Sequence, residues 1–137
     1  MFTLHPTLAA DTIEITHWDV CRVLLMNDAN YPWLILVPAR DGLNGLHEVS
    51  EEDQPRVMKE ITQASAALSN LYNPERMNVA ALGNMVPQLH IHIIARFKDD
   101  PAWPGPVWGV VPGREYEDEA LLETTTKLQA ALNGISI

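Results

Sequence analysis

Hydrophobic and polar residues alternate with a period of two in several short stretches of the chain. Residues 12–17, 20–26, 33–37 and 77–82 are rich in Val, Ile, Leu and Thr, and each ends near turn-forming residues. This pattern predicts a β-strand in each stretch. The connections between the first three are short, which favours antiparallel pairing.

A fifth predicted strand, residues 88–97, alternates most strictly. Gln88, His90 and His92 share one face, and the other face is wholly apolar, formed by Leu89, Ile91, Ile93 and Ala95. We expect the apolar face to be buried and the histidine face to present polar groups to something outside the core.

Two stretches have helical periodicity. Apolar residues recur at steps of three and four between residues 50 and 72: Val57, Ile61, Ala64, Leu68 and Leu71. Ser50 with Asp53 three positions later has the form of a capping box, so we predict an amphipathic helix that covers the apolar face of the histidine strand. Residues 116–132 predict a C-terminal helix, and residues 1–10 a short turn or single helical turn.

The stretch between the histidine strand and the last helix is rich in proline. Residues 99–113 contain four prolines with Trp103 and Trp108, which predicts an ordered coil or docked arm. Two tryptophans are costly to leave in water, so we expect the arm to be packed against the protein.

The order of elements predicts an α+β fold: an antiparallel sheet of five strands with a long helix and a C-terminal helix. With 137 residues, we expect a single domain, with its core at about 12–98 and the arm and last helix at 99–137. Its one cysteine, Cys21, allows no internal disulfide and suits a core position in a cytoplasmic protein. No apolar run reaches about 18 residues, so we predict no membrane span.

Charge narrows the classes of partner. The formal net charge is −9, and the nine Lys and Arg residues are scattered, so a nucleic acid polymer is not expected as a partner. The residues alone leave four interpretations of His90 and His92 open. They are surface polar residues, metal ligands together with His5, His17 or His47, acid–base groups, or a nucleophile with its assistant.

A family resemblance favours the last interpretation. Residues 86–94, with the sequence VPQLHIHII, resemble the signature of the histidine triad superfamily, His-φ-His-φ-His-φ-φ, where φ is apolar. Asn27 resembles the family's ribose-contacting residue, and Gly83-Asn84 precedes the signature where the family has a similar pair. The resemblance covers about residues 12–98. The sequence of residues 103–109, WPGPVWG, resembles a bacterial subgroup.

The resemblance implies a nucleotide phosphate hydrolase or transferase. Such an enzyme would act on the α-phosphate of dinucleoside polyphosphates or nucleoside phosphoramidates through a nucleotidyl-histidine intermediate. His90 would be the nucleophile, and His92 would donate to the phosphate oxygens. Asn84 would contact the scissile phosphate, and Asn27 and Asp28 the ribose; for this pair, turn formation is an equally good interpretation. Trp103 and Trp108 would stack on a base, or pack the arm over the sheet or across a dimer. Arg96 and Lys98 would contact distal phosphates or be solvated surface charges.

Three positions depart from the family pattern. Gln88 replaces the first histidine, and glutamine cannot transfer a proton near neutral pH. Met85 stands where many members have a small hydroxyl residue, and Trp33 follows Pro32 where the family often has histidine. Gln88 therefore supports an alternative, a nucleotide-binding regulatory protein with weak or no catalysis. The resemblance also implies a homodimer with a ten-stranded sheet; we expect no cofactor, no metal and no membrane partner.

Overall fold

The computed structural model describes residues 1–134 and has five strands and three α-helices in this part of the chain. The N-terminal half contains α1 (Pro6–Asp11), β1 (Thr12–His17), β2 (Cys21–Met26), β3 (Trp33–Pro38) and the short 3₁₀ helix η1 (Leu46–Glu48). Next come α2 (Gln54–Tyr72), β4 (Arg76–Ala80), β5 (Ile91–Arg96) and α3 (Asp118–Leu132). The predicted α+β fold with a long and a C-terminal helix is confirmed.

All five strands form one antiparallel sheet in the order β1-β2-β3-β5-β4. The chain leaves the sheet after β3, crosses it as α2 and returns through the edge strand β4 to β5, which lies between β3 and β4. In the register of the central pair, Ile35 lies opposite His92 and Trp33 opposite Ile94. Directly paired residues share a face, so Trp33 lies on the same face as the histidines.

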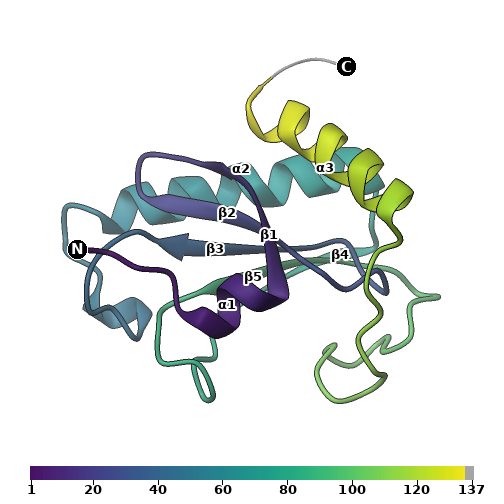
Figure 1. The fold of residues 1–137 in the computed structure, drawn as a ribbon, viewed down its shortest axis with the longest axis horizontal. Helices are drawn as coiled ribbons and strands as arrows, with labels where there is room; N and C mark the ends of the chain where they lie inside the picture. The colour runs from purple at the N-terminus through teal and green to yellow at the C-terminus, as the bar shows by residue number, and fades with distance from the viewer. Residues whose placement is uncertain (135–137) are drawn as a thin grey trace.

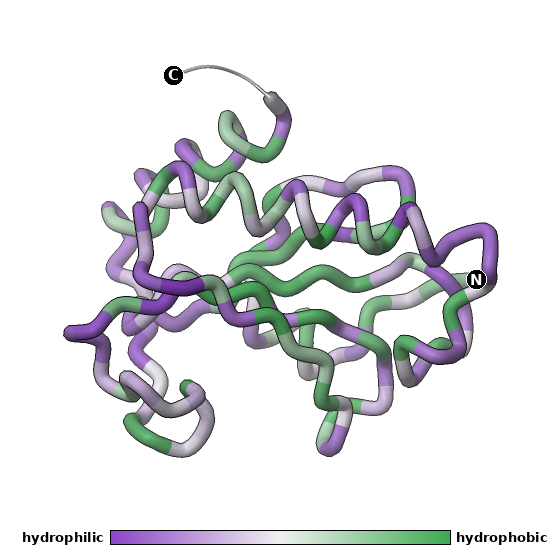
Figure 2. The backbone as a smooth tube through the Cα atoms, turned by 180° about the vertical axis from the view of Figure 1, so that it is seen from behind, coloured by the Kyte–Doolittle hydropathy of each residue, from purple (hydrophilic) through white to green (hydrophobic). Residues whose placement is uncertain are grey.

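Helices α2 and α3 lie on one side of the sheet, with α1 and the late coil on the other (Figure 1). Leu89, Ile91 and Ile93 pack in a buried cluster with the apolar face of α2. This confirms the predicted packing of the histidine strand against the long helix. The hydrophobic positions are concentrated in the central strands, as the tube in Figure 2 shows.

The histidine face of the sheet is also covered, which the alternating pattern of residues 88–97 did not predict. A second cluster on this face joins Trp33, Ile35 and Ile94 to Leu8 of α1 and Val107 of the arm. Phe2 and Leu4 of the N-terminal segment pack against its edge. All six residues of β5 are therefore buried, and the expectation of an open polar face is wrong.

Several predicted boundaries shift. The strand begins at Ile91, so Gln88, Leu89 and His90 precede it as extended coil. Helix α2 begins at Gln54: the Asp53 N–H bonds Ser50 Oγ, but the Asp53 carboxylate bonds Arg40 and does not complete the capping box. Strand β4 ends at Ala80 and α3 begins at Asp118. The single-domain boundaries stay a prediction, and residues 135–137 of that range lie outside the described part.

The proline-rich arm is ordered coil, as predicted, and a buried ion pair holds it. Arg96 is 1% exposed and bonds both carboxylate oxygens of Asp100, Nε to Oδ2 at 2.8 Å and Nη2 to Oδ1 at 3.0 Å. It also donates to Asn78 Oδ1 and to the Gly105 carbonyl. Both interpretations of Arg96, surface charge and phosphate contact, are therefore wrong. Lys98 remains an exposed residue near Glu75.

Candidate active site

His90 is held in one tautomer by the chain just before it. Its Nδ1 lies 2.6 Å from the Gln88 carbonyl oxygen. A carbonyl only accepts hydrogen bonds, so Nδ1 carries the proton. In the neutral ring, Nε2 then has a free lone pair. The ring is 7% exposed, and it is oriented as a nucleophilic or basic nitrogen would require.

His92 is held in the opposite tautomer. The Trp33 indole Nε1–H donates to His92 Nδ1 at 3.0 Å, so the proton of the neutral ring is on Nε2. Burial, followed by the charge of His90, lowers the pKa of His92 to about 4. His92 is therefore neutral at pH 7, and its Nε2–H is available as a hydrogen-bond donor.

Four aromatic rings enclose the site. The His90 and His92 rings meet edge to face with centroids 5.0 Å apart, and Trp108 meets His92 at the same distance and in a similar geometry. Trp33 contacts both His92 and Trp108. Trp108 is 39% exposed, so one part of its indole packs on His92 while another part faces solvent.

Gln88 turns its side chain away from this ring cluster and toward the N-terminal segment. Its Oε1 accepts the His5 N–H at 2.8 Å, and its Nε2 donates to the Thr3 carbonyl at 2.9 Å. Because both ends of the amide are engaged, Gln88 does not stand in the structure as a free polar group beside His90.

Asn27 and Asp28 anchor the segment that leads into α3. Asn27 Oδ1 accepts the Tyr116 N–H at 3.0 Å. Asp28 is buried, and its Oδ1 accepts the N–H groups of Asn30 and Arg114. The bond from Asn30 to Asp28 is a local turn bond, as the turn interpretation expects, whereas the bonds from Tyr116 and Arg114 are long-range. The role of Asn27 and Asp28 toward a ribose stays a prediction.

Asn84 lies in the exposed loop before the histidines, and within residues 1–134 no hydrogen bond joins it to His90 or His92. The loop tip is open to solvent, since Met85 is 94% exposed and Gly83 has a positive φ. A cavity of about 300 Å³ lies beside this loop, lined by residues 44–47, residues 81–83, Leu89 and His90. His90 is thus one of the residues that line this cavity.

Metal binding finds no support in the described residues 1–134. No group of three or more His, Cys, Asp or Glu side chains there is arranged to hold an ion. His5 caps α1 through Nδ1, and His17 and His47 are exposed. Within the same part of the chain, no helix is long and apolar enough to span a membrane.

Two contacts of the site were missed from the sequence. In the sequence, Trp33 stands out only as a departure from the family pattern, although it is the hydrogen-bond donor to His92. The antiparallel register of β3 and β5 is the signal that would have placed it, since residues diagonal across a strand pair touch. The N-terminal contact of Gln88 had no signal, because residues 3–5 and 88 are far apart in sequence and share no pattern.

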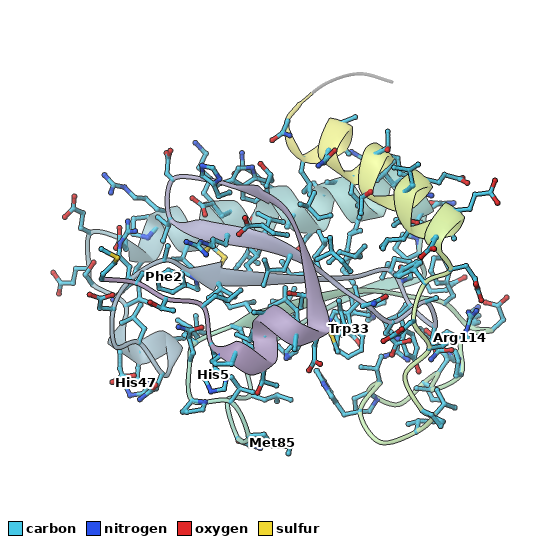
Figure 3. The ribbon with its side chains drawn as sticks, in the orientation of Figure 1. Phe2, His5, Trp33, His47, Met85 and Arg114 are labelled. Carbon is cyan, nitrogen blue, oxygen red and sulfur yellow. The ribbon has the colours of Figure 1, made fainter. Side chains whose placement is uncertain are left out.

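The fold is a five-stranded antiparallel sheet in which β5, between β3 and β4, carries His92 and is directly preceded by His90. This arrangement identifies a class of protein. Trp33, labelled in Figure 3, lies on the same side of the sheet as α1, where the histidine face is covered. Residues 8–99 match the HIT domain, so the chain belongs to the HIT domain family. Family membership places it in the class of nucleotide-binding hydrolases and transferases.

Solved structures agree over nearly the whole chain. A histidine triad protein from Marinobacter aquaeolei VT8 is 47% identical, with 99% of each chain covered and a TM-score of 0.95. One from Bradyrhizobium japonicum is 41% identical, covering 96% of this chain and 98% of that chain with a TM-score of 0.93. One from Sinorhizobium meliloti 1021 is 38% identical, covering 96% and 97% with a TM-score of 0.92. No curated protein matches the chain.

Proposed function

We propose that the protein hydrolyses or transfers nucleotides at the α-phosphate of dinucleoside polyphosphates or nucleoside phosphoramidates, with His90 as the nucleophile. The observation that carries this proposal is the opposite tautomers of the two histidines. The Gln88 carbonyl holds the His90 proton on Nδ1, and the Trp33 indole holds the His92 proton on Nε2. His90 therefore offers a lone pair on Nε2, and His92 offers an N–H hydrogen-bond donor on Nε2.

In the first step, His90 Nε2 attacks the α-phosphorus and an N–P bond forms as the bond to the leaving group breaks, a P–O bond in a dinucleoside polyphosphate and a P–N bond in a phosphoramidate. The leaving group departs with the electron pair, and the positive imidazole of the intermediate stays bonded to the Gln88 carbonyl through Nδ1–H. His92 Nε2–H donates to a non-bridging phosphate oxygen as charge develops there. Water then attacks the phosphorus, the P–N bond breaks, and the nucleoside monophosphate leaves while water's proton is released.

Gln88 bears on the choice of leaving group. An amide cannot give up a proton near neutral pH, and this amide is bonded to the N-terminal backbone. We infer that the preferred leaving groups are stable without protonation, such as the nucleoside polyphosphate released from a dinucleoside polyphosphate. Amines and alkoxides, which need a proton to leave, should react more slowly.

The test is release of AMP from labelled diadenosine tetraphosphate by the wild type, His90→Ala and His17→Ala. His17 is exposed at the end of β1 and controls for loss of a histidine elsewhere. We expect release by the wild type and His17→Ala but not by His90→Ala. Equal release by all three would remove His90 from the mechanism. AMP binding without release by the wild type would favour the alternative, a nucleotide-binding regulatory protein.

We also infer a homodimer in which two β4 strands pair to join the sheets. In support, β4 is an edge strand, bonded to β5 on one side only within the described residues. Val79 on this strand and Leu82 just beyond it are about half exposed, and unpaired apolar edges favour pairing with another chain. Sedimentation of the wild type should give twice the monomer mass, and Val79→Lys should shift it toward the monomer.

A further inference from the structure

Gln88 occupies the first triad position, but its side chain bonds the N-terminal backbone instead of turning toward the histidine rings. Its carboxamide bridges the Thr3 carbonyl and the His5 N–H, at 2.9 and 2.8 Å. These two backbone groups flank Leu4 and point the same way from an extended chain, so the amide pairs with them as a neighbouring strand would. The side chain thus fixes residues 3–5 against the loop that enters β5.

The main chain of the same residue sets the state of the nucleophile. The Gln88 carbonyl accepts the His90 Nδ1–H at 2.6 Å. Gln88 lies three residues before β5 begins, so no sheet ladder fixes this carbonyl. The Leu89 N–H belongs to the same planar peptide group as this carbonyl and donates to the Leu43 carbonyl at 2.9 Å. The side-chain bonds to residues 3–5 are a second support of the carbonyl that orients His90, on the Gln88 side of that peptide group.

The N-terminal segment is itself well anchored, so it can act as a support. Leu8 of α1 is buried in the second cluster, and Leu4 packs against it. The Phe2 ring lies beneath the Arg22 guanidinium at 4.9 Å. His5 caps α1 by accepting the Thr7 N–H on Nδ1 at 3.1 Å. Figure 3 shows Phe2 and His5 along this segment, on the side of the sheet that also carries the Met85 loop.

We propose that Gln88 is a positioning residue for the reaction: its side chain clamps residues 3–5, and the clamp holds its carbonyl on His90 Nδ1. The N-terminal segment is thereby part of the catalytic site, although it contains none of the triad positions. The inference rests on the proposed function in treating His90 as the nucleophile. The clamp itself is a structural relationship that can be measured without turnover.

The clamp can be broken from either partner. Gln88→Met keeps a side chain of similar length and removes both hydrogen bonds. His5→Pro removes the N–H that Gln88 Oε1 accepts, and the backbone there, with φ −56° and ψ 136°, is compatible with proline. His5→Ala is the matched control, because it loses the ring and its cap on Thr7 but keeps the N–H.

Kinetics and nitrogen-15 NMR of the histidine rings give two separate readouts. Gln88→Met and His5→Pro should each lower kcat/KM for AMP release from diadenosine tetraphosphate by about three- to tenfold, the range for losing one hydrogen bond. The double variant should be no slower than the slower single variant, because both changes break one linkage. In both, the His90 signal should change from the Nδ1–H tautomer to a mixture, whereas His5→Ala keeps the wild-type spectrum.

Opposite results would overturn the proposal. They are a wild-type His90 spectrum in both clamp variants, additive losses in the double variant, or equal losses in His5→Ala and His5→Pro. If the wild type releases no AMP, the proposed function fails, and the tautomer spectra still decide the clamp.

Discussion

The Trp33 indole N–H and the Nδ1 atom of His92 are 3.0 Å apart in the buried interior of the site. Because indole can only donate, this bond excludes a proton on Nδ1 and leaves the proton of the neutral ring on Nε2. Trp33 thus leaves His92 with an Nε2–H that can act as a hydrogen-bond donor. Two adjacent histidines acquire different chemistry from different neighbours.

Replacing Trp33 with Phe should remove this control while keeping an aromatic ring. We expect kcat/KM for AMP release to fall roughly three- to tenfold, the effect of one neutral hydrogen bond. Nitrogen-15 spectra of His92 should show both tautomers in the variant and one in the wild type. Trp108→Phe is the control, since Trp108 contacts the His92 ring without a hydrogen bond among the described residues. Its His92 spectrum should keep a single tautomer.

The low pKa of His92 makes stability depend on pH. In the native state the ring stays neutral down to about pH 4, whereas in the unfolded chain it takes up a proton near pH 6.5. The unfolded state therefore binds more protons in this window, and the free energy of unfolding should fall as pH drops from 6.5 to 4. The loss attributable to His92 is on the order of 3 kcal/mol.

Denaturant unfolding at several pH values between 4 and 7.5 measures this dependence. The matched variant is His92→Asn, whose amide oxygen can still accept a hydrogen bond but has no titrating group. Carboxylates contribute equally to both proteins, so the difference between the two curves isolates His92. Parallel curves would show that His92 titrates alike in the native and unfolded states.

The buried pair of Arg96 and Asp100 should contribute strongly to holding the arm. Asp100→Asn leaves the buried guanidinium without its counter-charge, and we expect a loss of about 3–5 kcal/mol in the free energy of unfolding. The comparison is Lys98→Ala, which breaks the exposed contact with Glu75 and should cost no more than about 1 kcal/mol. Chemical denaturation measures both. Equal effects would mean that the buried pair does not support the arm.

The hydroxyl of Tyr31 is buried and has no hydrogen-bond partner in the described residues. An unsatisfied buried hydroxyl costs about 1–3 kcal/mol, so Tyr31→Phe should leave the free energy of unfolding unchanged or raise it by about 1 kcal/mol. The Phe ring keeps the packing against Trp33. Thermal and denaturant unfolding of the two proteins test this. A clear loss of stability would show that the hydroxyl has a partner in solution.

The local pattern of residues predicted the elements well. Alternation placed β1 at Thr12–His17 without error, and helical spacing placed the C-terminal end of α2 at Tyr72. Both succeed because a strand or an amphipathic helix is encoded by neighbours two to four residues apart. The order of those elements was then enough for the fold class, since few arrangements bury one face of such a sheet.

The sequence by itself also determined which residues carry the candidate chemistry, because the two histidines and the amide lie together in one short motif. The tautomers and hydrogen-bond partners of these residues were decided only by the tertiary structure. Trp33 reaches His92 across paired strands, the segment of Thr3 and His5 reaches Gln88, and Arg96 turns inward to Asp100. Each contact joins groups brought together by strand register or by docking of a coil. Short-range periodicity carries no information about such contacts, whose energies depend on geometry and burial.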